Sequence, residues 1–389
     1  MKQVIRNGRF VFPDRIAEDV GLVLDGGTVE AVLPVGRLPA GCPVLDAGGC
    51  LVAPGFVDVH VHGGGGYLFS DATPEAIETA CRTHLRHGTT TLLPTLEACE
   101  TERTLAALRA LVEFARTHEL GPMIAGINLE GPFLNPAKAG AQPVAHIRAP
   151  DPALTRQLLD AGDGLVKVMT ISPELSGAEA VIRLLVERGV VAAIGHSTAS
   201  AELTTRAVEW GARLVTHVFS AMSGLHHREP GMAGVALDDG RLWCELTCDG
   251  IHVAPLAMRL VVKLKGVERV VLITDAIACL EAASEMKLFG HTVTVRDGAA
   301  RLPDGTLAGS VLTMERAVRN VAAAAANLDV PSAVRMATLT PAELLGEASR
   351  IGRLDRPGAR ANAVFLADDG SVIRTILDGK TVWEAAGAV

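Results

Sequence analysis

Residues 55–61 read GFVDVHV, a short run dominated by valine with few polar interruptions. Continuous apolar character without strict alternation is typical of a strand that is buried on both faces. Seven further runs of this kind follow in order along the chain: TTTLLPTL (89–96), MIAGINLE (123–130), GLVKVMTI (164–171), VVAAIGHS (190–197), RLVTHVF (213–219), WCELTCDG (243–250) and RVVLITDA (269–276). The sequence therefore predicts eight buried strands.

Most intervals between these runs carry the apolar spacing of an amphipathic helix. The clearest are TPEAIETACRTHLRHG (73–88), TERTLAALRALVEFARTH (101–118), GAEAVIRLLVERG (177–189) and SAELTTRAVEWG (200–211). Gly88, Gly189 and Gly211 stand where three of these helices should end. A strand–helix unit repeated eight times predicts the α/β class and a closed (β/α)8 barrel of the TIM type.

The later intervals are less regular. SGLHHREPGM at residues 223–232 is only weakly helical, and we interpret it as an active-site loop. The last helices are expected at residues 313–328 and around residues 340–344. No further sheet is predicted between the eighth strand and these helices.

The two ends of the chain resemble each other and differ from the middle. Both consist of short β-rich runs separated by turns: VIRNGRFVF (4–12), VGLVLD (20–25), TVEAVL (28–33), ANAVFLA (361–367), SVIRTIL (371–377) and TVW (381–383). Neither end could bury its own apolar face alone. We therefore predict a small β-sandwich domain built from residues 1–54 and 346–389, with the barrel at residues 55–345.

Composition excludes several classes of partner. The 389 residues carry a formal net charge of −8 without a long Lys/Arg run, which argues against a nucleic-acid or membrane-surface partner. No stretch approaches the length of a membrane span, and the start lacks the apolar core of a secretory signal, so the expected location is the cytoplasm. The seven scattered cysteines include no CxxC pair. A disulfide framework is not expected, and Cys244 and Cys248 are predicted to be buried strand thiols.

Polar side chains stand late in, or at the end of, five of the predicted strands. These residues are His60, His62, Glu130, His196, His217 and Asp275. In a (β/α)8 barrel the chemistry lies at the carboxyl ends of the strands, where all eight strands open onto one rim. The sequence therefore predicts that these side chains gather around a shared divalent cation.

Two of the candidates form the pair His60-Val61-His62. Side chains alternate along a strand, so both imidazoles face the same way, and neutral imidazole is a common zinc ligand. Glu130 closes a buried run, where a carboxylate must be paired or coordinated. The alternatives are an ion pair from Glu130 to Lys138, or Lys167 as the bridging ligand, although the position of Lys167 inside its run favours a core role.

His196 and His217 end neighbouring strands at the same depth, which favours a shared site over two isolated core histidines. Asp275 lies deep in the last strand and is either a structural buried carboxylate or a general base beside a cation. Arg228 could clamp an anion or be an exposed charge. His252 could contact substrate or be an exposed or capping histidine.

These motifs resemble a known group of enzymes. PGFVDVHVHG is similar to the opening of the amidohydrolase superfamily. The set INLEGPF, IGHS, THVFSAM, HREPG, DGIHV, TDA and LAGSVLTM resembles the N-acetylglucosamine-6-phosphate deacetylase family, in order and over nearly the whole chain. The resemblance implies hydrolysis of the acetamide of an N-acetyl amino sugar 6-phosphate to the amine and acetate.

The resemblance also implies residue roles at the metal. Glu130, His196 and His217 would hold one divalent ion, commonly zinc, with Fe²⁺ or another divalent ion possible. His60 and His62 would allow a second ion, with Glu130 bridging. Asp275 would be the general base beside the metal.

The resemblance assigns a further set of residues to substrate binding. They are Ala141, Gln142, Ser220, Ala221, Arg228, Asp249, His252, Leu307, Ala308 and Gly309. Arg228 and His252 match positions that bind the sugar phosphate across a homodimer interface, and residues 307–309 match a segment lining the acetyl side. Two positions depart from the family: Gln142 replaces a histidine, and Ser220 replaces an asparagine.

Three alternatives stay open at this point. The substrate could be N-acetylgalactosamine 6-phosphate, or the enzyme could act on N-acyl or cyclic amides. Arg228 favours a phosphorylated substrate over those amides. A barrel that binds a sugar phosphate without catalysis is the alternative from another class, and the complete set of six metal-site residues argues against it.

Overall fold

The computed structural model describes residues 2–325 and 327–387. Its centre is an eight-stranded sheet in which every strand is parallel to its neighbour and the order follows the sequence. The strands are β8 (Phe56–Val61), β11 (Thr89–Glu97), β12 (Ile127–Glu130), β13 (Val166–Ile171), β14 (Val191–Ile194), β15 (Leu214–Val215), β16 (Trp243–Thr247) and β17 (Val270–Ile273). The prediction of eight buried parallel strands is confirmed.

Backbone hydrogen bonds join the last strand of this sheet to the first. Just beyond β17, the N–H of Asp275 donates to the carbonyl of His60 at 2.9 Å, and the carbonyl of Ala276 accepts from the N–H of His62 at 2.8 Å. The sheet therefore closes into a barrel at the place where three of the predicted metal-site residues meet.

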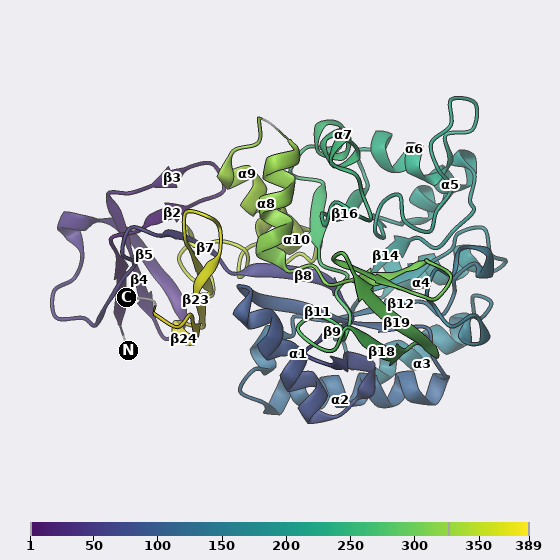
Figure 1. Cartoon of the computed structure of the whole chain (residues 1–389), viewed down its shortest axis with the longest axis horizontal. Coiled ribbons are helices and arrows are strands. Elements are labelled where there is room, and N and C mark those ends of the chain that lie inside the picture. Colours follow the sequence, from purple (N-terminus) through teal and green to yellow (C-terminus); the bar gives the residue numbers. More distant parts are fainter. Residues whose placement is uncertain (1, 326, 388–389) are drawn as a thin grey trace.

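Helices surround the barrel (Figure 1). They are α1 (Pro74–Arg86), α2 (Thr101–Thr117), α3 (Pro152–Ala161), α4 (Ala178–Glu187), α5 (Ala201–Trp210), α6 (Gly231–Asp238), α7 (Pro255–Lys265), α8 (Met314–Ala324), α9 (Val330–Met336) and α10 (Leu339–Leu344), with short 3-10 turns at Val35–Arg37, Phe69–Asp71, Gly121–Met123, Pro136–Lys138 and Val144–His146. Local caps explain where two of them begin. The hydroxyl of Thr73 accepts from the N–H of Ala76 at the start of α1, and that of Ser200 accepts from the N–H of Leu203 at the start of α5.

The inside of the barrel changes from apolar to polar along the strands. At one end Val168, Leu214 and Trp243 belong to an apolar cluster that also contains side chains of α10. Two residues further along the chain, and so on the same face, lie Thr170 of β13, Thr216 just past the end of β15, and Glu245 of β16. This polar layer lies directly below the carboxyl ends of the strands, where the candidate site is found.

Two sheets lie beside the barrel, and the larger one combines strands from both ends of the chain (Figure 1). One sheet has the order β5-β4-β1-β6 and the other β24-β23-β22-β7-β2-β3. Their bounds are β1 (Gln3–Arg6), β2 (Arg9–Val11), β3 (Ile16–Ala17), β4 (Val20–Asp25), β5 (Thr28–Pro34), β6 (Val44–Asp46), β7 (Leu51–Pro54), β22 (Ala363–Leu366), β23 (Val372–Leu377) and β24 (Lys380–Glu384). Phe10, Leu22, Phe365 and Ile376 pack in one core, so the two ends bury each other's apolar faces. The domain limits at residues 54 and 346 stay a prediction.

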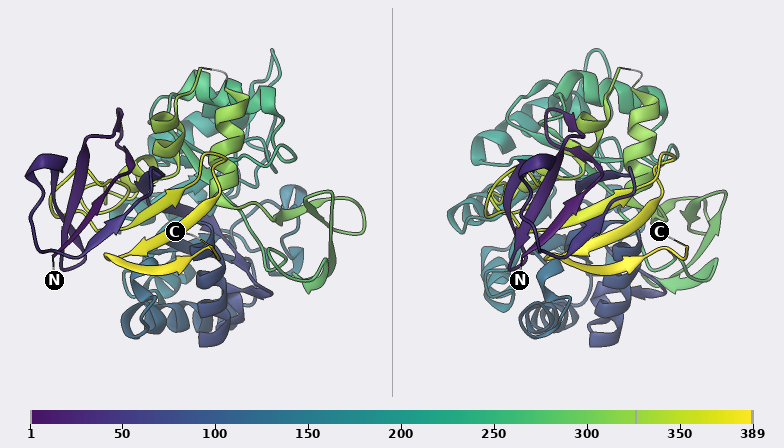
Figure 2. Two further views of the ribbon diagram at one scale, coloured as in Figure 1. Left: turned by 60° about the vertical axis from the view of Figure 1, so that its left-hand side comes forward. Right: turned by 90° about the vertical axis from the view of Figure 1, so that its left-hand side faces the viewer.

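A four-stranded antiparallel sheet follows β17, where no sheet was predicted. It comprises β18 (Glu285–Leu288), β19 (His291–Arg296), β20 (Ala299–Arg301) and β21 (Leu307–Ser310), and Figure 2 shows it to one side of the barrel. Its turns contain Gly290, Asp297-Gly298 and Asp304-Gly305, which are hairpin signals present in the sequence. A smaller pair, β9 (Gly63–Gly64) and β10 (Tyr67–Leu68), follows β8.

Three further observations concern the loop before α6, the cysteines and the length of the helices. The loop predicted at residues 223–232 extends to Pro230, and α6 begins at Gly231. All seven cysteines are free thiols, and Cys244 and Cys248 are buried. In the part of the chain that the structure describes, no helix combines the length and apolar character needed to cross a bilayer.

Candidate metal centre and substrate pocket

The six predicted metal-site residues all lie at the carboxyl rim of the barrel. His60 is in β8 and Glu130 is the last residue of β12, whereas His196, His217 and Asp275 each follow the end of a strand by two residues. These three have φ values of 48°, 28° and 51°, in the left-handed region that non-glycine residues rarely adopt. Such strained backbone is concentrated at functional sites in proteins.

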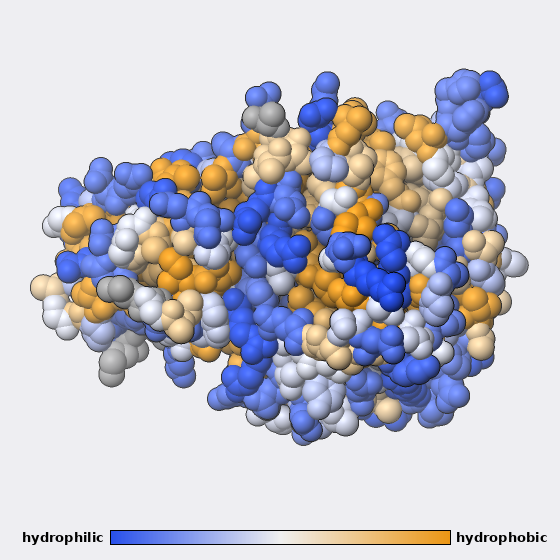
Figure 3. Space-filling model, viewed as in Figure 1, coloured by the Kyte–Doolittle hydropathy of each residue, from blue (hydrophilic) through white to orange (hydrophobic). Residues whose placement is uncertain are grey.

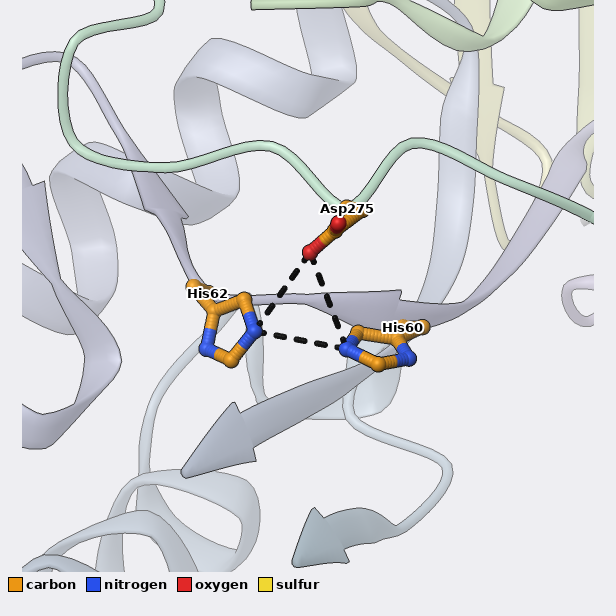
Figure 4. A group of neighbouring side chains, drawn as sticks. All are labelled: His60, His62 and Asp275. Carbon is orange, nitrogen blue, oxygen red and sulfur yellow. Dashed lines mark hydrogen bonds and ion pairs between the residues drawn. The ribbon is translucent and has the colours of Figure 1, made fainter. Parts of the chain in front are cut away.

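The side chains of His60, His62 and Asp275 form the first group, drawn in Figure 4. The Nε2 atoms of His60 and His62 lie 3.3 Å apart. Oδ1 of Asp275 is 3.7 Å from Nε2 of His60 and 3.5 Å from Nε2 of His62. The three ligand atoms therefore face one another around a common centre.

The side chains of Glu130, His196 and His217 form the second group. Oε1 of Glu130 lies 2.9 Å from Nε2 of His196 and 2.9 Å from Nε2 of His217, and these two nitrogens are 3.1 Å apart. Oε2 of Glu130 is 3.2 Å from Nε2 of His62 in the first group. The Glu130 carboxylate thus lies between the two groups.

This geometry fits a divalent metal. Zinc binds imidazole nitrogen at about 2.0–2.1 Å in a tetrahedral arrangement, which separates neighbouring ligand atoms by about 3.4 Å. The Nε2 pairs at 3.1 and 3.3 Å approach that separation. Nδ1 of His196 donates to the carbonyl of Lys138 at 2.7 Å, so its proton is on Nδ1 and Nε2 is available to a metal.

The carboxylates and imidazoles of the cluster shift one another's pKa values. Burial opposes the charged form of Glu130, but the imidazoles of His60 and His196 hold its pKa well below the usual value. Burial likewise disfavours the charged form of His60, yet the carboxylates of Glu245 and Glu130 raise its pKa well above the usual value. Glu130 is therefore ionised, as a metal ligand must be.

The structural alternatives at Glu130 are not observed. Lys138 contributes its backbone carbonyl to His196, and its ammonium makes no ion pair with Glu130 among the described residues. Lys167 is the second residue of β13 and belongs to neither three-residue group.

A cavity of about 460 Å³ opens directly above the two groups and includes His62, Glu130, His196, His217 and Asp275 in its walls. Eight of the ten predicted substrate residues also line it: Ala141, Gln142, Ser220, Ala221, His252, Leu307, Ala308 and Gly309. This volume lies within the range of small-molecule sites.

The other two predicted substrate residues do not line the cavity of their own chain. Arg228 is exposed in the loop before α6, with Nη1 2.8 Å from Nε2 of His227. Asp249 lies behind His252, whose Nδ1–H donates to its carboxylate at 2.6 Å. Asp249 therefore orients His252 instead of reaching the cavity itself.

The two departures from the family pattern differ in their contacts. Oε1 of Gln142 accepts from the N–H of Ala98 at 2.8 Å, and its amide nitrogen donates to Oε2 of Glu130. Both polar atoms of the Gln142 side chain thus form hydrogen bonds within the protein, although the sequence predicted a contact with substrate. The backbone N–H of Ser220 donates to the carbonyl of His217 at 2.9 Å.

Among the residues that sequence reasoning missed, two contact predicted metal ligands directly. Phe289, between β18 and β19, lines the cavity and packs edge-on against His62 at 6.2 Å between ring centroids. Glu245 lies in β16 and accepts a hydrogen bond from His60. A carboxylate within the apolar run WCELT was the available signal for Glu245, the same signal that identified Glu130.

Comparison with known proteins agrees with this site. A sequence model described as the amidohydrolase family matches residues 51–382. The chain is 35% identical to the N-acetylgalactosamine-6-phosphate deacetylase of Escherichia coli O157:H7, covering 97% of this chain and 98% of the relative. It is 36% identical to the N-acetylglucosamine-6-phosphate deacetylase of Bos taurus, covering 88% of this chain and 86% of the relative.

A solved structure extends the likeness to three dimensions. It is a variant of the N-acetyl-D-glucosamine-6-phosphate deacetylase of Mycobacterium smegmatis in complex with N-acetyl-D-glucosamine-6-phosphate, with a TM-score of 0.90 and 36% identity, covering 98% of this chain and 99% of that one. On its sequence, its barrel and the relatives that it matches over nearly their full length, this chain belongs to the amidohydrolase family.

Proposed function

We propose that the protein hydrolyses the acetamide of an N-acetyl amino sugar 6-phosphate, with N-acetylglucosamine 6-phosphate as the preferred substrate, to the amino sugar phosphate and acetate. The observation that carries the proposal is the convergence of four imidazoles and two carboxylates at the floor of one cavity. The relatives named for this reaction support the choice of substrate.

The metal would be held by the two groups described above. Glu130, His196 and His217 form one site, and His60, His62 and Asp275 form the other, with zinc the first candidate and Fe²⁺ another. A divalent ion bound there would lower the pKa of a water molecule to about 7 and would polarise the amide carbonyl.

Asp275 is the proposed general base. Its side chain reaches both the imidazoles of His60 and His62 and the cavity, so it can contact both the attacking water and the substrate. Asp275 accepts a proton from water as the C–O bond forms, and it returns that proton to nitrogen as the C–N bond breaks. The protonated amine leaves far more readily than the amide anion.

The cavity walls suggest how the substrate lies. Leu307, Ala308 and Gly309 present backbone and apolar side chains on one side, which suits an acetyl group. Asp249 holds the His252 ring on the wall through Nδ1–H, so Nε2 of the neutral ring can accept from a sugar hydroxyl and Nε2–H of the charged ring can donate to a phosphate oxygen. We extend the proposal to a cytoplasmic location, where charged sugar phosphates are retained because a bilayer excludes them.

We further propose a homodimer in which Arg228 completes the site of the partner. Arg228 is exposed and does not line the cavity of its own chain. Three leucines spaced four residues apart on α7, Leu256, Leu260 and Leu264, are 58%, 44% and 57% exposed. Figure 3 shows hydrophobic side chains over α7 at the upper edge of the molecule. Such a stripe suits a subunit contact.

N-acetylgalactosamine 6-phosphate is the second candidate substrate. A relative named for that sugar matches nearly the whole chain, and Gln142 and Ser220 replace the residues that the glucosamine family usually has. The two sugars differ in the orientation of one hydroxyl, so a change in two residues of the cavity wall bears directly on the choice.

The test is acetate release from both 6-phosphates, from unphosphorylated N-acetylglucosamine and from an N-acetyl amino acid, before and after treatment with a chelator. We expect release from the phosphorylated sugars only, loss of activity with chelator, and recovery on addition of zinc. Equal activity on the unphosphorylated sugar would contradict the substrate class. Full activity after complete metal removal would contradict the mechanism.

A further inference from the structure

Glu245 is a carboxylate at the centre of the barrel that the proposed reaction does not use. It lies in the middle of β16 and is fully buried, with no exposed surface. Its side chain points into the barrel, as do those of Trp243 and Thr247 two residues away on the same strand. A buried carboxylate is strongly unfavourable unless partners compensate it.

One oxygen of Glu245 accepts hydrogen bonds from both halves of the metal centre. Oε2 accepts from Nδ1–H of His60 at 2.9 Å and from the backbone N–H of His217 at 3.1 Å. His60 belongs to the first three-residue group and His217 to the second. Glu245 therefore joins the two groups from the polar layer below them.

The bond to His60 decides which ring nitrogen carries the proton in the neutral ring. A carboxylate oxygen accepts here, so the proton lies on Nδ1 and the lone pair on Nε2. Nε2 then faces Nε2 of His62 at 3.3 Å and Oε1 of Glu130 at 3.6 Å. Glu245 thus holds His60 in the orientation and the tautomer that a metal requires.

The bond to His217 supports an unfavourable turn. His217 has a φ of 28°, and in this conformation its Nε2 lies 2.9 Å from Oε1 of Glu130. Glu245 holds the turn at two points. Its carboxylate accepts from the N–H of His217, and its backbone carbonyl accepts from the N–H of Val218 at 2.9 Å.

We propose that Glu245 is a positioning residue of the metal centre, which holds the His60 ring with Nδ1 protonated and stabilises the turn that carries His217. The inference rests on the metal site of the proposed function. Glu245 does not line the cavity, so it acts on the substrate only through these two histidines.

The test compares two variants that differ in whether residue 245 offers a hydrogen-bond acceptor. Glu245→Gln keeps an oxygen that accepts both hydrogen bonds, whereas Glu245→Leu removes the acceptor. Thr247→Val is the matched control, because Thr247 is buried on the same face of β16 and its hydroxyl has no hydrogen-bond partner among the described residues. The readouts are the zinc dissociation constant, by competition with a chromophoric chelator, and the thermal midpoint.

We expect Glu245→Leu to bind zinc about 10–100-fold more weakly, the usual cost of losing a group that orients a metal ligand. Glu245→Gln should stay within about threefold of the wild type, and Thr247→Val should be unchanged. A folded Glu245→Leu variant with wild-type zinc affinity would overturn the positioning role.

If the Glu245→Leu variant does not fold, a second measurement on the wild-type protein tests the inference. Nitrogen NMR of the wild-type protein labelled at histidine should show a proton on Nδ1 of His60 and none on Nε2 when zinc is bound. The opposite tautomer would overturn the inference. Wild-type protein that binds no divalent ion overturns both proposals, whereas wild-type protein that binds zinc and releases no acetate overturns the proposed reaction alone.

Discussion

The side-chain amide of Gln142 donates a hydrogen bond of 2.5 Å to Oε2 of Glu130, the carboxylate that lies between the two halves of the metal centre. The same oxygen is 3.2 Å from Nε2 of His62. Gln142 is itself held by the backbone N–H of Ala98. One of the two departures from the family pattern is therefore connected to the metal ligands as well as to the cavity.

The first prediction follows from this contact. Gln142→Ala should weaken zinc binding and lower kcat/KM by about tenfold or more, because Glu130 loses the donor that orients Oε2. Steady-state kinetics and a zinc titration measure both effects. Gln157→Ala, at an exposed glutamine of α3, is the control. A Gln142→Ala enzyme with a raised KM but unchanged zinc affinity would show that Gln142 acts on the substrate alone.

The second prediction concerns the proposed base. Asp275→Asn should lower kcat by about 10²–10⁴-fold, the contribution typical of general acid–base catalysis. The ion held by Glu130, His196 and His217 should remain, because Asp275 does not belong to that group. Metal analysis and acetate release on the same preparation test this. The exposed Asp160→Asn is the control, and retained turnover in Asp275→Asn would remove Asp275 from the role of base.

The third prediction tests whether Arg228 acts across a dimer. Arg228→Ala and Asp275→Asn should each be nearly inactive on the phosphorylated sugar. A mixed dimer has one site with an intact Asp275 and an Arg228 supplied by the other chain. Mixing the two variants under subunit exchange should therefore restore about a quarter of the wild-type rate, since half the dimers are mixed and each has one active site. No recovery in verified mixed dimers would place Arg228 outside the partner's site.

The fourth prediction is a pH dependence of stability that originates at His84. This histidine is fully buried and its Nε2–H donates to the carbonyl of Gly63 at 3.0 Å, and burial lowers its pKa to about 4. A histidine in the unfolded chain has a pKa of about 6.5. At a pH between the two pKa values, the unfolded chain therefore binds more protons than the folded chain. His84 therefore stabilises the fold above about pH 6.5, and this stability is lost as the pH falls towards 4, by about 3 kcal/mol in total.

Urea unfolding at several pH values measures this effect. His84→Gln keeps a donor for Gly63 and cannot titrate, so its free energy of unfolding should fall less steeply than that of the wild type across the window. His291→Gln, at an exposed histidine, should follow the wild type. Parallel pH profiles for wild type and His84→Gln would contradict the assignment.

Much of the fold could be predicted because its signals are local. The valine-rich run at residues 55–61 became β8, and the periodic segment at residues 101–118 became α2 (Thr101–Thr117). Polar residues at strand ends identified the rim, since the carboxyl ends of parallel strands must meet. The sheet of β18–β21 was missed although its turn signals were present, because its short strands are only partly buried and lack strong apolar runs.

The sequence by itself determined the eight-strand rhythm, the pair His60-Val61-His62 and the rim positions of Glu130 and Asp275, because burial patterns and side-chain alternation are properties of neighbouring residues. Only the tertiary structure decided that Glu245 reaches His60, which is 185 residues away, and that Gln142 contacts Glu130. Those contacts depend on how the barrel closes and on which rotamers pack inside it, and no local pattern encodes either.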